Sequence, residues 1–272
     1  MHYWKPLFLL LILISLYGCG GGDSASSSSS SSGSSSSSSA SSSGSPTGNV
    51  CPANKPCAIM AFGDGVMEGL EPVGTGGYAN NGGFRPALLE MAVADGKSIT
   101  FVGVRENGPS STEHPLANLR KHSGFSAIRL EDLVLMVPDP IRRFPADIVL
   151  IHAGTHEVAS TGFDNIGPQS FSKEMQLLQS VMQRFYSLNR SGLLVVSNFA
   201  GLRHGDPRSI AIGSAIERAV ADFKRQNPAA QVVLADHLAR GITRGHDNLM
   251  PNAAGYHAMA EVWYQAIQPY LK

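Results

Sequence analysis

Residues able to support proton transfer and ester chemistry gather in three short stretches of this 272-residue chain. In chain order these read Gly63-Asp64-Gly65, then Ala153-Gly154-Thr155-His156-Glu157, then Asp247-Asn248-Leu249-Met250-Pro251-Asn252. A carboxylate can orient a base, an imidazole can carry a proton near neutral pH, and backbone N–H groups can stabilise an oxyanion. The question is whether these stretches catalyse a reaction or only bind a ligand.

The elements that position these stretches alternate between short apolar runs and longer amphipathic ones. We predict strands at 58–62, 99–102, 148–151, 193–197 and 232–235, and helices at 84–94, 127–135, 171–188, 210–226 and 253–270. Ser170 and Asn252 are the expected N-caps of the third and last helices. This alternation predicts one three-layer α/β/α domain with a central parallel sheet of about five strands. Ligands bind outside the carboxyl ends of such strands, so the three stretches should converge on one rim.

These stretches resemble the sequence blocks of the SGNH (GDSL-type) hydrolase family. The first family block reads Gly-Asp-Ser, and the last reads Asp-x-x-His-Pro-Asn-x-x-Gly-Tyr. The stretch from Pro145 to Val158 resembles the third block, and Phe101-Val102-Gly103 followed by His122-Ser123-Gly124-Phe125-Ser126 is similar to the second strand and second block of acetylxylan-esterase-like members. Four blocks in the family's order imply the flavodoxin-like SGNH hydrolase fold.

The resemblance puts unsuitable residues at three reactive positions. Gly65 falls on the nucleophilic serine, Met250 on the base histidine and His156 on the asparagine oxyanion donor, whereas Gly124 and Asp247 match the family. Glycine offers no atom that attacks a carbonyl, and a thioether accepts no proton near neutral pH. Losing the triad removes on the order of 10⁶ in rate, and losing an oxyanion donor roughly another 10² to 10³. The resemblance therefore implies a pseudoenzyme with no catalytic residues and no cofactor.

The residues at these positions also have a structural interpretation. Gly65 suits a tight strand-to-helix turn, Met250 can fill the space of an imidazole, and Asp247 can cap a helix or accept bonds from backbone N–H groups. We expect the remnant cleft to bind its ligand through a set of seven positions: Asp64, Gly65, Gly124, Thr155, His156, Asp247 and Asn252.

Relocated catalysis is the less favoured alternative. Ser123 and Asp64 are the nearest possible nucleophiles, and His246, directly before Asp247, is the nearest possible replacement base. Nothing in the spacing aligns Ser123 with His246, and a loop histidine is more often simply hydrogen-bonded. Metal binding is not expected, because the histidines show no ligand spacing such as His-x-x-x-His on one helix face.

The N-terminal part predicts export. Residues 1–19 have the apolar run of a signal peptide and end in Leu16-Tyr17-Gly18-Cys19, which looks like a lipobox with Cys19 as the lipidated residue. Residues 20–50 are rich in serine, glycine and alanine and predict a flexible linker before a domain at 51–272. We expect a cell-envelope lipoprotein at the outer membrane or cell surface, anchored to the membrane through Cys19, or otherwise a secreted protein.

Cysteine usage and charge narrow the expectations further. Cys51 and Cys57 should form a disulfide in an oxidising compartment. The 21 basic and 21 acidic residues balance, which gives no electrostatic footprint for nucleic acid.

The expected function is binding of a polysaccharide or an acylated carbohydrate. Aromatic residues near the relevant loops are Tyr78, Phe84, Phe125 and Phe163, of which Phe84 is expected in the core. The alternatives are an active carbohydrate esterase (deacetylase) with a rearranged site, and a structural or assembly partner without a small-molecule ligand.

Overall fold

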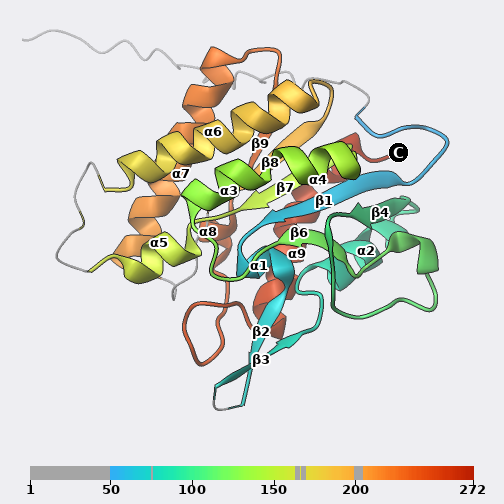
Figure 1. Ribbon diagram of the computed structural model, residues 1–272. Coiled ribbons are helices and arrows are strands. Elements are labelled where there is room, and N and C mark those ends of the chain that lie inside the picture. Colours follow the sequence, from blue (N-terminus) through green and yellow to red (C-terminus); the bar gives the residue numbers. More distant parts are fainter. Residues whose placement is uncertain (1–49, 75, 163–165, 167–169, 199–204) are drawn as a thin grey trace, which may run out of the picture. The chain divides into compact units, whose positions relative to one another are not determined.

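The computed structural model describes residues 50–74, 76–162, 166, 170–198 and 205–272. The expected signal peptide, Cys19, the linker up to residue 49 and Phe163 lie outside the described residues. The described chain forms a three-layer α/β/α domain (Figure 1).

The central sheet is built around β1 (Cys57–Gly63), whose apolar residues are buried on both faces. On one side β1 pairs in parallel with β7 (Ile148–His152), which is followed by β8 (Leu193–Ser197) and β9 (Gln231–Ala235). On its other side the first half of β1 pairs with β4 (Ile99–Val102) and its last residues with β6 (Lys121–Gly124). This is the strand order of flavodoxin-like sheets.

All five predicted strands are present, and the sheet has two more. The additional strands are β6 and the short antiparallel β5 (Arg105–Glu106). Strand β6 reads Lys-His-Ser-Gly, so it lacks the apolar run by which the other strands can be found. A separate hairpin of β2 (Leu70–Val73) and β3 (Gly77–Asn80) extends away from the sheet beyond α1 (Gly65–Glu68) (Figure 1).

Helices cover both faces of the sheet. One face packs against α2 (Arg85–Ala94) and α9 (Ala253–Ile267). The other packs against α3 (Leu130–Met136), α4 (Pro138–Arg143), α6 (Ser172–Leu188) and α7 (Pro207–Gln226). The other helical segments of the described residues are short turns at the strand ends or in connections: α5 (Thr155–Ser160), α8 (His237–Arg240) and the 3₁₀ turns Pro115–Ala117 and Gln268–Tyr270.

The two predicted N-caps differ in outcome. Asn252 caps α9, since its side chain accepts from the Gly255 N–H at 2.8 Å. The Ser170 prediction is wrong, because Phe171 occupies the N-cap of α6 with φ of +67°. Phe171 is buried in the core and makes no side-chain capping hydrogen bond. The start of α6 therefore coincides with burial of an aromatic ring, which capping preferences do not predict.

Both ends of the domain lie at the amino edge of the sheet. The predicted disulfide between Cys51 and Cys57 is present, directly before β1. The segment from Cys51 to Cys57 and the last residue, Lys272, line the same cavity of about 300 Å³. Within the described part of the chain, no helix is both long and apolar enough to cross a bilayer.

Candidate functional site

The stretches that could do chemistry converge on one rim, as predicted. Gly63 joins the first stretch to the end of β6. Its carbonyl oxygen accepts from the Phe125 N–H at 2.9 Å, and its Cα lies in register with Gly124. Asp64 then joins the third stretch, because its backbone N–H donates to His152 O at 3.2 Å and its Oδ2 accepts from the Thr155 N–H at 3.3 Å. The rim lies at the carboxyl ends of β1, β6 and β7, where a ligand of an open α/β sheet is expected.

Gly65 and Met250 meet at the centre of this rim. A Cβ atom added to Gly65 would lie 3.1 Å from Met250 Cε, 3.7 Å from Met250 Sδ and 3.4 Å from Leu70 Cδ1. Residues at 65 and 250 would therefore contact each other directly if position 65 carried a side chain. As the chain stands, a thioether methyl group and a leucine methyl group line this space, and neither can attack a carbonyl or accept a proton.

Asp64 is a buried structural carboxylate. Its Oδ1 accepts from the Val66 N–H at 3.1 Å and contacts His152 Nδ1 at 3.0 Å. Burial alone would raise the pKa of Asp64, but the charge and hydrogen bond of His152 and the bonds from Thr155 and Val66 outweigh it and leave the pKa below its ordinary value. These bonds hold the start of α1 and leave Asp64 nearly inaccessible, so it is not positioned as an alternative nucleophile.

Gly124 is needed at its position for packing. An added Cβ would lie 2.1 Å from the Glu68 backbone nitrogen and 2.4 Å from the Met67 carbonyl carbon. The Gly124 N–H donates to His122 Nδ1 at 3.1 Å. That bond directs the Gly124 N–H toward the imidazole of its own strand. The lack of a side chain at Gly124 allows the close contact between β6 and α1.

Asp247 accepts three hydrogen bonds. Its Oδ1 accepts from the Leu249 N–H at 3.0 Å and the Met250 N–H at 3.1 Å, and its Oδ2 accepts from the Tyr78 hydroxyl at 2.8 Å. The first two bonds fix the turn that carries Met250. The third joins this turn to the hairpin of β2 and β3.

Of the other three expected ligand-binding residues, Asn252 bonds within its own loop, Thr155 is buried and His156 lines a separate cavity. Asn252 uses its side chain within its own loop, with Oδ1 accepting from Gly255 N–H and Thr243 Oγ1, and Nδ2 donating to Arg244 O. Thr155 is buried at the start of α5. His156, the next residue, is half-buried and lines a cavity of about 190 Å³ between α5 and α6.

The structure does not bring Ser123 and His246 into a catalytic pair. Ser123 lies fully buried in β6, where its Oγ accepts from the Val104 N–H at 3.3 Å. His246 is exposed in the loop before Met250. A nucleophile must be accessible and within hydrogen-bond reach of its base, and this geometry meets neither condition.

Two arginines near the rim are missed by sequence reasoning. Burial lowers the pKa of Arg244 to about 9, whereas Tyr256, Asp247 and Asp64 act in the opposite direction. Arg244 thus stays protonated at neutral pH among the residues of the rim. Arg85 is fully buried, and its guanidinium donates to the carbonyl oxygens of Met67, Glu68, Asn107 and Leu119.

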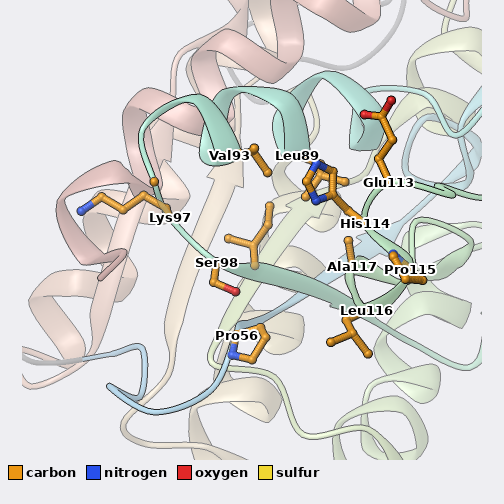
Figure 2. A pocket seen from close by; sticks show the side chains of 12 residues that line it. Pro56, Leu89, Val93, Lys97, Ser98, Glu113, His114, Pro115, Leu116 and Ala117 are labelled. Atoms are coloured by element: carbon orange, nitrogen blue, oxygen red, sulfur yellow. The ribbon is translucent and has the colours of Figure 1, made fainter.

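A larger cavity lies at the opposite edge of the sheet. It has a volume of about 450 Å³ and lies beside the start of β4, with Leu89 and Val93 of α2 along one wall and Leu116 along the other (Figure 2). Its rim carries Lys97, Glu113 and His114 (Figure 2). None of the residues at the carboxyl-end rim lines this cavity.

Comparison with known proteins identifies the fold. A family 3 carbohydrate esterase from Clostridium thermocellum superposes with a TM-score of 0.61 at 20% identity, over 79% of this chain and 96% of that structure. A family 3 carbohydrate esterase from Talaromyces cellulolyticus gives a TM-score of 0.59 at 21% identity, over 78% and 97%. Structures of a lipase/acylhydrolase and of an acetylxylan esterase are also similar. The chain has the SGNH hydrolase fold that these proteins share.

Sequence comparison alone gives a more distant result. A multidomain esterase from Ruminococcus flavefaciens is 24% identical over 238 residues, which span 79% of this chain and 29% of that protein. No family model matches the sequence.

Proposed function

We propose that this domain binds a polysaccharide or an acylated carbohydrate on an esterase fold and does not hydrolyse it efficiently. The observation that carries the proposal is the position of Met250 Cε, 3.1 Å from where a side chain at Gly65 would begin. Hydrolysis by the route of the SGNH family requires a nucleophile and a base at these two positions, and both groups are missing.

A carbohydrate ligand is supported by the proteins that share the fold. The two structures with the highest similarity quoted above are named as carbohydrate esterases, and the distant sequence relative is named as an esterase. Their substrates would be acylated sugars, so a binding domain derived from such a protein would retain surfaces for a sugar chain.

We further propose that the chain is exported and attached to the cell envelope through Cys19. A flexible linker between an anchor and a binding domain favours capture of a polymer, because it lets one domain search a large volume at high local concentration. Metabolic labelling with a palmitate analogue tests this attachment. Labelling that disappears in the Cys19→Ala variant is the expected result, and an unlabelled wild-type protein would contradict it.

The catalytic part of the proposal is tested by turnover of p-nitrophenyl acetate and of acetylated xylan. We expect rates equal to those in buffer for the wild-type protein. A rate well above buffer that disappears in Ser123→Ala or His246→Ala would establish a rearranged esterase and overturn the proposal.

The binding part is tested by isothermal titration with xylohexaose and by co-sedimentation with insoluble acetylated xylan. Retention of the wild-type protein on the polymer is the expected result. Absence of binding to both probes, with recovery of a stoichiometric protein partner from the source cells, would support the assembly role instead.

A further inference from the structure

Among the four aromatic residues near the rim, Tyr78 is the one that the structure shows as exposed. Phe84 is fully buried in the core, and Phe125 is partly buried beneath the guanidinium of Arg105. Phe163 lies outside the described residues. Tyr78 exposes 51% of its surface, so its ring is available to a ligand.

The ring of Tyr78 is also held in place. Its hydroxyl donates to Asp247 Oδ2 at 2.8 Å, a bond strengthened by the negative charge of the acceptor. Asp247 itself is fixed, because its Oδ1 accepts from two backbone N–H groups of its own turn. The hydrogen bond and the charge of Asp247 raise the pKa of Tyr78, which agrees with this pairing.

The hairpin that carries Tyr78 is joined to the rim at three further points. Tyr256 Oη donates to Leu70 O at 2.7 Å at the base of the hairpin. The side chain of Leu70 faces Gly65, where an added Cβ would be 3.4 Å away. Pro72 stands opposite Tyr78 in the β ladder and packs against Gly245, whose added Cβ would be 2.5 Å from Pro72 Cγ. Tyr78 therefore has a defined position relative to Gly65 and Met250.

We propose that Tyr78 is a sugar-stacking platform that Asp247 positions, and that it holds a neutral pyranose ring of a polysaccharide beside the Gly65 site. This proposal rests on the proposed function. The matching position in the SGNH family belongs to the aspartate that orients the base histidine; here Met250 offers no imidazole N–H, and the free carboxylate oxygen accepts from Tyr78 instead. Asp247, which has no histidine to orient, would thus orient the ring of Tyr78.

The chemistry of the surroundings favours a neutral sugar. An aromatic face binds the C–H face of a pyranose through dispersion and burial of apolar surface, and a tyrosine fixed in one rotamer does so with little loss of side-chain entropy. The exposed neighbours His246 and Asn248 can exchange hydrogen bonds with hydroxyl groups. The charges of Asp247 and the protonated Arg244 act on each other, so the rim carries charges of both signs and no excess of one that would select a charged sugar.

The test is a double-mutant cycle measured by titration with xylohexaose. We expect Tyr78→Ala to weaken binding at least about tenfold, as for the loss of a central aromatic contact. Tyr78→Phe keeps the ring and removes its hydrogen bond, and should weaken binding about threefold. Asp247→Asn keeps an oxygen for the two backbone N–H groups but replaces the charged oxygen that accepts from Tyr78 by an amide nitrogen, which cannot accept. This variant should also weaken binding about threefold, but have no effect when Tyr78 is already alanine.

A matched control is available at the other edge of the domain. Tyr264 Oη donates to Asp95 Oδ2 at 2.6 Å, so Tyr264→Phe removes a comparable tyrosine–aspartate bond. This variant should bind xylohexaose like the wild type. Binding by the wild type that Tyr78→Ala leaves unchanged would overturn the platform and leave the proposed function standing. Equal effects of Asp247→Asn with and without Tyr78 would overturn the positioning role, and a wild type that binds no sugar would overturn both proposals.

Discussion

Gly65, Met250, Asp247 and Tyr78 form one connected set of contacts. The methyl group of Met250 borders the space above Gly65, the Met250 N–H donates to Asp247, and the other oxygen of Asp247 accepts from Tyr78. A histidine at position 250 would need a carboxylate oxygen to orient its ring. Asp247 Oδ1 already accepts from two backbone N–H groups, so the histidine would have to compete with Tyr78 for Oδ2. Building the family's serine, histidine and aspartate set at this rim would therefore require more than two substitutions.

This relation predicts the behaviour of variants that carry a serine at position 65 and a histidine at position 250. We expect Gly65→Ser with Met250→His to give weak hydrolysis of p-nitrophenyl acetate, because the Tyr78 hydroxyl competes for Asp247. Adding Tyr78→Phe should raise that rate at least about tenfold, since an oriented imidazole is a far better base than an unoriented one. Initial rates at fixed enzyme concentration measure the effect. Equal rates for the double and triple variants would show that the Tyr78 bond does not compete.

Gly124 provides a prediction about stability. Gly124→Ala would force a Cβ against the Glu68 backbone nitrogen. This nitrogen is not free to move, because Asp64 caps the start of α1 and Arg85 binds the carbonyl groups at its end. We expect a loss of about 3 kcal/mol in the free energy of unfolding, measured by urea denaturation. Gly77→Ala is the control, because its nearest neighbour would be at an ordinary 3.7 Å. It should change stability by less than about 0.5 kcal/mol.

At the scale of elements, Arg85 joins three segments that are distant in sequence. It donates to the carbonyl oxygens that end α1, to Asn107 before β6, and to Leu119 after the 3₁₀ turn. Burial lowers the pKa of Arg85 only to about 10, so it remains a cation at neutral pH. One side chain thus satisfies carbonyl groups that no regular helix or strand satisfies.

Arg85→Met should therefore be strongly destabilising. The variant keeps much of the volume but leaves several buried carbonyl groups without a donor, and we expect a loss of about 3 to 5 kcal/mol. Arg143→Met is the control, since Arg143 forms an exposed pair with Asp139. Its expected loss is below about 1 kcal/mol. Thermal and urea unfolding followed by circular dichroism measure both variants, and similar losses would contradict the role of Arg85.

The elements that could be predicted from the sequence are those whose burial is apolar. Strands β1, β7 and β8 are covered on both faces by helices, so their residues form continuous hydrophobic runs. Strand β6 is equally central to the site but polar. Its buried side chains have hydrogen-bond partners, since His122 Nδ1 accepts from the Gly124 N–H and Ser123 Oγ accepts from the Val104 N–H. Such pairing depends on tertiary contacts that no local pattern reveals.

The same distinction applies to the site. The meeting of positions 65 and 250 follows from the blocks at the strand ends, and the backbone bonds of Asp247 follow from its place in a turn. The contact of Tyr78 with Asp247 joins residues more than 100 positions apart. Arg244, which interacts with Asp247 and Asp64 at the rim, lies in a loop without a sequence pattern. Neither has a signal in spacing or composition.

At the scale of the whole domain, buried histidines predict a loss of stability in acid. Burial, and then the charges of Arg85 and Arg105, lower the pKa of His122 to about 3, and burial lowers that of His237 to about 3. Both histidines titrate near pH 6.5 when the chain is unfolded, so between pH 6.5 and 3 the unfolded state binds more protons. Stability should therefore fall as the pH is lowered through this window.

The expected loss between pH 6.5 and 5 is on the order of 2 kcal/mol for each histidine. Urea unfolding at pH 7.5, 6.5, 5.5 and 5.0 measures it. Replacing His122 by asparagine should reduce the pH dependence by about half, whatever its effect at neutral pH. The lowered pKa of Asp64 adds a further loss only below its ordinary value near 4. A free energy of unfolding that stays constant from pH 7.5 to 5 would contradict this account.

The neighbouring positions of Cys57 and Lys272 at the amino edge of the sheet have a practical consequence. The first strand of the domain begins beside Lys272. The rim with Gly65 lies at the opposite, carboxyl end of the same strands. The unit can therefore be inserted into a surface loop of a host protein, or immobilised on a sensor chip by either end, with the Gly65 rim directed away from the attachment point.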